Sequence, residues 1–307
     1  MFVIKNKKIF FILSGILVTA SIFIIAMFGL NFGIDFKGGS ILEVAYIDVE
    51  HPSVEQLKVD LQELNLGNFT VQETVFSDTQ DEGIILRTRD LSEEERATIV
   101  SIISQEKKYQ IEEKRYNSIG PVIGKELKGK ALWAILIVVL AIILFVAFAF
   151  RKVTEVANSD NKVSSWKYGF AAIIALVHDV LIPTGIFALL GHYFITYQID
   201  TVFVMAALAI LGFSVNDTIV VFDRIRENLT IAKKETFEET VGKSLRQTVT
   251  RSVNTSLTTL IVLLTLYFWG GEATKQFALI LSIGVVVGTY SSIFLASPLL
   301  TLFQKKK

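Results

Sequence analysis

The sequence predicts an α-helical polytopic membrane protein with six transmembrane helices and one α+β domain outside the membrane. Three features predict this class: six long apolar stretches, a polar segment with strand and helix patterns between the first two stretches, and a biased distribution of Lys and Arg. Hydrophobic residues make up 51% of the 307-residue chain and charged residues 20%, below the share of about 25% that is usual in soluble domains.

Six stretches reach the length of about 20 apolar residues that a helix needs to cross the hydrocarbon core. The first stretch follows three lysines, as the apolar part of a signal peptide does. It is too long for that role, and no convincing small-residue cleavage site follows it, so we expect an uncleaved first span. The predicted spans are residues 9–30, 131–150, 168–191, 201–222, 252–271 and 277–303.

The distribution of Lys and Arg predicts the orientation. These residues are concentrated before span 1, between spans 2 and 3, between spans 4 and 5, and after span 6. Cytoplasmic connections carry such an excess, so we expect a multi-pass protein of the cytoplasmic membrane with both termini in the cytoplasm. The expected divisions are residues 1–30 (N-terminus and helix 1), 31–125 (extracytoplasmic domain) and 126–307 (helices 2–6, with a cytoplasmic loop at about 223–250).

The segment at residues 31–125 is polar enough to fold in water. Ser53 with Gln56, and Ser92 with Glu95, fit the capping box that begins a helix. The resulting order β-α-β-β-α-β is that of a ferredoxin-like domain, which indicates a fold class and leaves the function open. Strands are expected at residues 41–49, 69–76, 84–89 and 109–119, and helices at 53–64 and 92–106.

The connection between spans 4 and 5 carries an apolar pattern of its own. Phe237, Val241, Leu245 and Val249 recur every four residues, which predicts a helix with one apolar face. Either a short amphipathic helix on the inner membrane surface or a connector helix packed on the bundle would produce this pattern.

Asp217 places a carboxylate inside span 4, where a charged group is costly and should face the bundle interior or a wet cavity. It lies six residues from Asp223 at the cytoplasmic edge, a depth of roughly 9 Å, and Arg251 in span 5 lies at roughly 7 Å. Because spans 4 and 5 are antiparallel, the two side chains can pair. Desolvation disfavours the charged carboxylate and the guanidinium favours it, so the pair is either a protonation switch or a static lock between two helices.

Asp179 lies near the centre of span 3, directly after His178. An ionisable pair at this depth is a candidate functional site. One interpretation is a proton relay, and the other is a buried Asp with hydrogen-bonding partners on neighbouring spans, with His178 in a structural role. The candidate partners are Ser214, Asn216, Asn254 and Thr255.

Glycines mark two further places. Residues 33–40 (GIDFKGGS) follow span 1, and their three glycines permit a turn and a close backbone approach. No P-loop Lys-Ser/Thr pattern follows, so a structural junction is expected rather than a phosphate cradle. Gly284 and Gly288 form a GxxxG pattern in span 6, which favours close helix packing.

Several function classes lack the residues they need. The chain has no cysteine, which excludes disulfides and thiolate metal sites. No zinc spacing, nucleophile elbow or nucleotide motif is present, so we expect no metal, no cofactor and no hydrolase or kinase activity. The formal net charge of +0 gives no reason to expect a nucleic-acid partner.

The run GFSVNDTIVVFDRIREN at residues 212–228 resembles the most characteristic segment of the SecF family, membrane subunits of the bacterial SecDF complex. The resemblance covers essentially the whole chain, and no fused SecD-type half is seen. Further segments similar to the family follow the same order: residues 33–40, 120–127 (GPVIGKEL), 178–181 (HDVL) and 244–259.

This resemblance implies a transport role. SecDF proteins assist the SecYEG channel by using the proton motive force to draw preproteins outward. They are related to the resistance-nodulation-division superfamily, whose members couple proton flow to motion of outer domains. Asp217 and Arg251 fall on the family's proton-pathway positions. The expected proton pathway comprises Asp217, Arg251 and Asp179, with His178, Asn216 and Thr218 beside them, and the family signature comprises Gly33, Asp35, Gly38 and Gly39.

The expected partners are SecD, SecYEG, a translocating preprotein and membrane lipid, with no nucleic acid and with the proton gradient as the energy source. A SecD-like partner is expected to be obligate and to contact spans 4 and 6, because of Asp217 and the Gly284/Gly288 surface. Two rival interpretations are a half-unit of a proton-driven exporter, which would need an outer domain larger than about 95 residues, and a structural stabiliser of the translocon that conducts no protons.

The predicted orientation can be tested with single cysteines, because the chain has none of its own. A cysteine at Thr79 is expected to react with a membrane-impermeant maleimide in intact cells, and one at Asn158 only after the cells are opened. The reverse labelling pattern would overturn the orientation.

Overall fold

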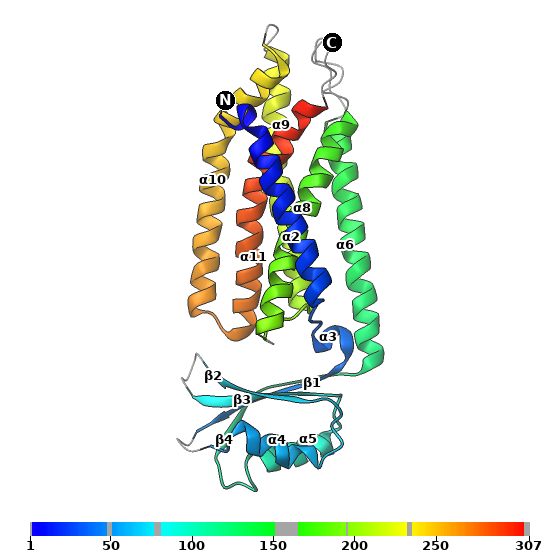
Figure 1. Ribbon diagram of the computed structural model, residues 1–307, viewed down its shortest axis with the longest axis vertical. Helices are drawn as coiled ribbons and strands as arrows, with labels where there is room; N and C mark the ends of the chain where they lie inside the picture. Colours follow the sequence, from blue (N-terminus) through cyan, green and yellow to red (C-terminus); the bar gives the residue numbers. More distant parts are fainter. Residues whose placement is uncertain are drawn as a thin grey trace. The chain divides into compact units, whose positions relative to one another are not determined.

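The computed structural model describes residues 2–47, 51–76, 81–150, 165–194, 196–231 and 235–303. These residues form two compact units, a helix bundle (Met1–Asn31 with Trp133–Lys307) and an α+β domain (Phe32–Leu132) (Figure 1). Thr79 and Asn158 lie outside the described residues. The boundary expected at residue 125 falls inside a continuous helix, so the chain enters the bundle without a separate linker.

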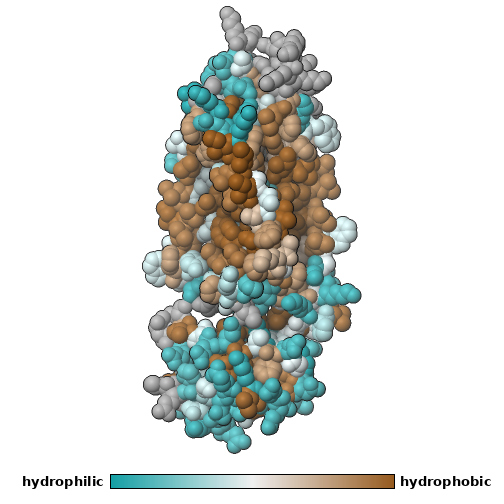
Figure 2. Space-filling model, in the orientation of Figure 1, coloured by the Kyte–Doolittle hydropathy of each residue, from teal (hydrophilic) through white to brown (hydrophobic). Residues whose placement is uncertain are grey.

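Six helices are long and apolar enough to cross a membrane, as predicted. Hydrophobic side chains cover most of the visible face of the bundle (Figure 2), as expected for a surface in contact with acyl chains. A short helix, α1 (Phe2–Lys5), precedes them. The spanning helices are α2 (Lys7–Phe28), α6 (Pro121–Ala149), α8 (Ser165–Tyr193), α9 (Thr201–Ile231), α10 (Phe237–Trp269) and α11 (Glu272–Ser291), the last continued by η1 (Ser292–Ala296) and α12 (Ser297–Leu302).

The expected loop at about residues 223–250 is largely helical. Residues 223–231 continue α9, and α10 begins at Phe237, where Thr236 and Glu239 form a capping box. Phe237, Val241 and Leu245 are buried in the core of the bundle. The apolar pattern therefore belongs to the first turns of a spanning helix packed on the bundle, and not to a separate helix on the membrane surface.

Small residues allow the helices to approach closely. A Cβ atom added at Gly284 would overlap Ile210 of α9, and one at Gly288 would lie 3.1 Å from Cβ of Ser214. A Cβ at Gly185 of α8 would lie 2.5 Å from that of Ser21 in α2. The GxxxG pattern of span 6 thus packs α11 against α9 within this chain.

The last spanning helix widens where α11 becomes η1, a single π-helical segment. Pro298 follows it and has no N–H to donate to the preceding turn. Ser297 compensates in part by donating from Oγ to the carbonyl oxygen of Ser292 at 2.8 Å. Such π-turns are frequent at functional sites, and this one presents Ser291 and Ser292 to the bundle interior, where both are fully buried.

The α+β domain has the predicted ferredoxin-like order, and its antiparallel sheet has the strand order β2-β3-β1-β4. The two helices pack together, with Leu57, Leu61, Ile99 and Ile103 in a core shared with the sheet. The elements are β1 (Gly39–Tyr46), α4 (Val54–Gln62), β2 (Thr70–Val75), β3 (Glu82–Thr88), α5 (Glu93–Ile103) and β4 (Ile111–Ile119).

The predicted cap of α5 is confirmed. Ser92 Oγ accepts from the Glu95 backbone N–H at 3.2 Å, and the Ser92 N–H donates to the Glu95 carboxylate at 2.9 Å. The hydrogen bond from Arg89 lowers the pKa of Glu95 to about 2. The helix ends at Ile103, three residues earlier than expected, because residues 105–107 adopt positive φ values of 45°, 57° and 74°.

The glycine junction explains the GIDFKGGS segment in structural terms. Gly38 and Gly39 have φ values of 78° and 128°, which favour glycine. A Cβ at Gly38 would lie 2.8 Å from Cα of Pro121, and one at Gly124 would lie 2.8 Å from N of Gly38. The backbone entering β1 therefore packs directly on the backbone that begins α6.

His51 ties the start of α4 to the β2–β3 hairpin. Its Nε2 lies 2.8 Å from Oε2 of Glu82, and its ring stacks on Tyr46 with 5.2 Å between centroids. The Glu82 hydrogen bond, with a further contribution from Glu73, raises the pKa of His51 above its usual value.

Because the folded pKa is raised, this contact stabilises the domain fully below about pH 6.5, and the contribution is lost as the pH rises through the raised pKa. In the full-length protein, NMR titration of the His51 ring is expected to give a midpoint above 6.5 that falls in Glu82→Gln. Equal midpoints in the two proteins would contradict the assignment.

Candidate functional site

Asp179 organises a hydrogen-bonded cluster at the centre of the bundle. Its side chain is fully buried. Oδ1 lies 2.8 Å from Nδ1 of His178, and Oδ2 accepts from the hydroxyls of Ser214 on α9 and Ser291 on α11, the latter at 2.6 Å. We call these four residues the Asp179 cluster. It satisfies a buried carboxylate from three helices at once, as burial in a low-dielectric interior requires.

The Asp179 cluster also reaches α2. The His178 ring stacks on Tyr290 with centroids 5.9 Å apart. The Tyr290 hydroxyl donates to the carbonyl oxygen of Phe10 at 3.1 Å and accepts from Ser14 at 3.3 Å. His178 Nε2 is buried without a hydrogen-bond partner in the part of the chain that the structure describes. A chain of polar contacts thus joins Asp179 to the first spanning helix.

A second set of contacts ties α9 to the widened end of span 6. Thr218 and Ser292 share a hydrogen bond of 2.8 Å, and Ser292 Oγ donates to the carbonyl oxygen of Ser214 at 3.4 Å. The widened turn therefore supplies hydroxyl groups to both Ser214 and Thr218.

Asp217 lies on another side of α9 and is held differently. Its side chain is 4% exposed, and Oδ2 has no hydrogen-bond partner among the described residues. Its electrostatic neighbours are Ser252 and Arg251 of α10. The Ser252 hydroxyl is likewise buried and, although it lies close to Asp217, has no partner in hydrogen-bond geometry among the described residues. The bundle thus holds one carboxylate that is fully hydrogen-bonded and one that is not.

Arg251 does not form the expected ion pair. No nitrogen of Arg251 lies within 4 Å of an Asp217 oxygen in the described structure, and Arg251 is exposed on the surface of the bundle. It begins a row of exposed polar side chains along one face of α10, at the i, i+3, i+4, i+7 spacing of a helix face. This polar patch comprises Arg251, Asn254, Thr255 and Thr258.

Of the partners considered for Asp179, only Ser214 makes the contact. Asn216, Asn254 and Thr255 are exposed, whereas Asp179 is fully buried. Gly284 and Gly288 are covered by α9, so the surface expected to bind a partner through span 6 is already occupied within the chain. The sequence interpretation missed Ser291, Ser292 and Tyr290, although the polar run GTYSS at residues 288–292 inside an apolar span was a usable signal.

The family-signature residues lie in the α+β domain. Gly33 and Gly38 flank the short helix α3 (Ile34–Lys37), which contains Asp35, and Gly39 begins β1. Among the described residues, no group of three or more His, Asp or Glu side chains is arranged to hold a metal ion.

Two family profiles match this chain. One is described as "Protein export membrane protein SecD/SecF, C-terminal" and matches residues 99–306, and the other is described as "SecD/SecF GG Motif" and matches residues 23–46. The second profile covers the junction at Gly38 and Gly39, and the first covers all residues of the Asp179 cluster.

Curated relatives and solved structures agree with these profiles. Protein translocase subunit SecF of Thermobaculum terrenum is 39% identical, with 99% of this chain and 94% of that protein covered. The SecF subunit of Anaerolinea thermophila is 35% identical, with 98% and 94% covered. The crystal structure of SecDF, a translocon-associated membrane protein from Thermus thermophilus, is similar with a TM-score of 0.82 and 30% identity. The match covers 99% of this chain and 38% of the SecDF chain.

The two carboxylates are expected to differ when their charge is removed. Asp179→Asn disturbs three hydrogen bonds to a buried group, each worth about 1.5–3 kcal/mol, and should reduce the unfolding free energy of the bundle by about 2–4 kcal/mol. Asp217→Asn breaks none, and should change it by less than about 1 kcal/mol. Unfolding by SDS in mixed micelles measures both, and equal destabilisation would contradict the distinction.

Proposed function

The chain belongs to the SecF family of protein translocase subunits, and we propose that it uses the proton motive force, through Asp217, to assist export of preproteins by SecYEG. In this proposal, protonation and deprotonation of Asp217 shift the bundle and so move the α+β domain. Both termini face the cytoplasm and the α+β domain lies outside, as the Lys and Arg distribution predicts.

The observation that carries this proposal is the unsatisfied carboxylate oxygen of Asp217. A group that exchanges a proton in each cycle benefits from a site that does not fix one protonation state by a complete set of hydrogen bonds. Asp217 has such a site, whereas the Asp179 carboxylate accepts from Ser214 and Ser291 and contacts His178. We therefore assign the titrating role to Asp217 and a mainly structural role to Asp179.

Arg251 supports a partner of the SecD type. An exposed Arg on a spanning helix is costly against lipid, and the polar patch adds Asn254, Thr255 and Thr258 on the same face. A second membrane subunit covering this face would remove the patch from lipid and enclose Asp217 and Arg251 together. The SecDF structure similar to this chain is longer, and this chain spans 38% of its length.

The membrane potential limits the free energy that proton flow can supply to a movement of the α+β domain. A proton that crosses 100 mV releases about 2.3 kcal/mol, enough to bias a modest conformational change. The shift must travel through α2 and α6, the helices that flank the domain in the chain. The contacts of Tyr290 with Ser14 and Phe10 offer a route from the bundle centre to α2.

A structural stabiliser of the translocon without proton conduction is the alternative function. It is favoured by one observation, the hydrogen bonding of both oxygens of the Asp179 carboxylate, which resembles a static tie between helices. Variants at Asp217 distinguish the two functions, because a stabiliser has no need of a titrating group at that position.

Asp217→Asn and Arg251→Met are expected to insert and assemble normally and to lose the stimulation of preprotein export by the proton gradient. Asn keeps the size of the side chain but cannot titrate, and Met keeps an apolar stem without the charge. The measurement is gradient-dependent preprotein uptake into inverted membrane vesicles that contain the partner subunits. The double variant is expected to recover no gradient dependence.

Asp223→Asn is the matched control, because it makes the same chemical change on the same helix at a residue paired with Arg226 on the surface. It should retain stimulation. Normal gradient-dependent export from Asp217→Asn at normal protein level would remove Asp217 from the mechanism and leave the stabiliser function.

A further inference from the structure

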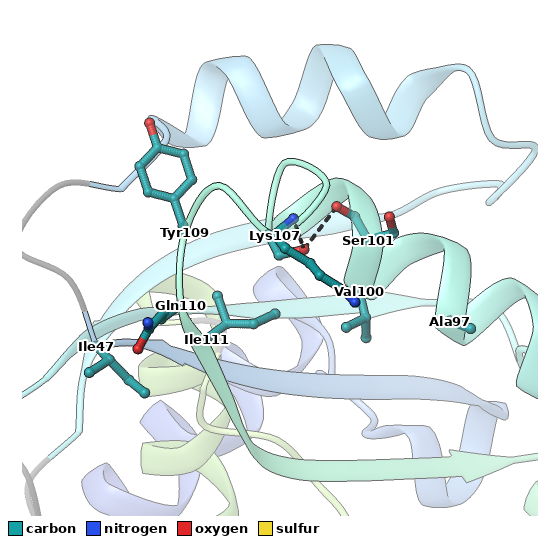
Figure 3. Close-up of a pocket in the computed structure, with 9 residues that line it drawn as sticks. Ile47, Ala97, Val100, Ser101, Lys107, Tyr109, Gln110 and Ile111 are labelled. Carbon is teal, nitrogen blue, oxygen red and sulfur yellow. Dashed lines mark hydrogen bonds between the residues drawn. The ribbon is translucent and has the colours of Figure 1, made fainter.

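The α+β domain contains a groove that no part of the proposed proton pathway uses. It has a volume of about 480 Å³ and lies between α5 and the start of β4 (Figure 3). Val100 and Ser101 line it from the helix, Ile111 from the start of β4, Tyr109 from the turn before β4, and Ile47 from the residue that follows β1. Ile47 is 57% exposed. This volume lies within the range of sites that bind ligands.

One wall of the groove belongs to an edge strand. β4 is the terminal strand of the sheet and pairs only with β1 among the described strands. The Ile47 N–H donates to the Gln110 carbonyl oxygen at 3.0 Å, so this opposed pair is of the hydrogen-bonded kind. Pairs alternate along an antiparallel ladder, and the next pair, Tyr46 and Ile111, is therefore non-hydrogen-bonded. The N–H and C=O of Ile111 consequently point away from β1, toward the open edge.

The same alternation makes the backbone of Glu113 point outward, and the free edge is short. A register irregularity between Glu43 and Val44 of β1 interrupts the ladder just beyond Glu113. At that end Arg96 bridges α5 to Glu113 at 2.8 Å. At the other end the positive-φ turn at residues 105–107 is held by Ser104, whose Oγ accepts from the Lys107 N–H at 3.2 Å. The groove lies beside this turn, and its lining is mainly apolar, with Ser101, Lys107 and Gln110 among its polar members.

We propose that this groove binds a short extended segment of an unfolded polypeptide, which adds a strand to β4 and lays alternate apolar side chains on Val100 and Ile111. An outward N–H and C=O on one residue recognise a peptide backbone, and strand addition to a sheet edge uses this chemistry. The identification of that polypeptide as a preprotein rests on the proposed function, but the capacity of the groove to bind an extended chain does not.

A second copy of this chain fits the groove less well than an unfolded segment. After Ile111, β4 is rich in charged side chains, including Glu112, Glu113, Lys114 and Arg115. Charged edges with a bulge disfavour long pairing between folded sheets. An unfolded segment needs only the few residues beside the groove and can place apolar side chains in it.

The test uses the full chain in phosphatidylcholine nanodiscs without a proton gradient or a translocon. The probe is a fluorescein-labelled peptide of alternating valine and threonine with terminal lysines, and binding is followed by fluorescence anisotropy. Ile111→Pro removes the outward N–H without breaking the ladder to β1, and Ser101→Phe fills the groove from α5. Each is expected to raise the dissociation constant by about tenfold or more, the equivalent of one or two lost contacts.

Two matched controls are expected to bind as the wild-type protein does. Ile111→Val keeps the backbone donor, and Thr98→Phe adds the same ring to an exposed position of α5 that does not line the groove. If Ile111→Pro unfolds the domain, Ser101→Phe on the helix surface still tests the site.

The proposal is overturned if the wild-type chain does not bind the peptide, if both groove variants bind it normally, or if Thr98→Phe weakens it equally. It is also overturned if the chain self-associates through β4, so that Ile111→Pro abolishes a dimer and no peptide binds. Because the peptide-binding measurement uses no proton gradient, its result says nothing about gradient-dependent export by Asp217→Asn. Loss of gradient-dependent export in Asp217→Asn likewise says nothing about peptide binding in the groove.

Discussion

The cost of placing a carboxylate in hydrocarbon governs the arrangement of the helix bundle. Asp179 is fully buried. His178 contacts its Oδ1, and its Oδ2 is satisfied because α9 and α11 bring Ser214 and Ser291 to it. Those hydroxyls can reach the carboxylate because Gly284 and Gly288 let α11 approach α9 closely, and because α11 widens directly after Ser291. Three helices are therefore fixed relative to one another by one polar group.

The second intramembrane carboxylate, Asp217, lies on the same helix α9 but outside this network. The bundle thus combines a firmly held set of helices with one carboxylate oxygen that has no hydrogen-bond partner among the described residues.

Local patterns in the sequence predict the elements well, and long-range partners poorly. The six spans and the β-α-β-β-α-β order follow from hydrophobic period and capping residues such as Ser92 and Glu95, which act over a few positions. The number of residues between Asp217 and the cytoplasmic edge predicts that Asp217 lies at the depth of Arg251, and both Arg251 and Ser252 of α10 are its electrostatic neighbours. The same count cannot predict which way Arg251 points, because the rotation of a helix about its axis depends on packing contacts spread over the whole bundle. For the same reason Asn216, Asn254 and Thr255 looked equivalent to Ser214 as partners of Asp179, and only Ser214 faces it.

The surfaces left open by this chain are of two chemical kinds. The polar patch of α10 offers a charge and an amide on a spanning helix, beside the hydroxyls of Thr255 and Thr258, which donate to carbonyl oxygens of the same helix. A charged group exposed on such a helix is costly against lipid. The groove beside β4 offers an apolar floor and a short length of unpaired backbone in a domain that folds around its own core. Folded partners match the first surface and unfolded chains match the second. The proposed function, which joins a membrane partner and an exported polypeptide, would use both kinds.

The junction of the α+β domain has a mechanical consequence. β1 and β4, the first and last strands, are direct neighbours, and the first register pair, Gly39 with Ile119, lies where the chain both enters and leaves. A force that separates these two connections would break the hydrogen bonds between β1 and β4 one after another, starting at this end. A sheet resists force in this direction least. A force that displaces both connections together carries the domain along with no load on the ladder. Gly38 packs closely on Pro121 and Gly124, and this contact holds together the end of the β1–β4 pair at which the chain enters and leaves. The β1–β4 ladder is therefore loaded least when both connections move together, and the packing of Gly38 on Pro121 opposes their separation.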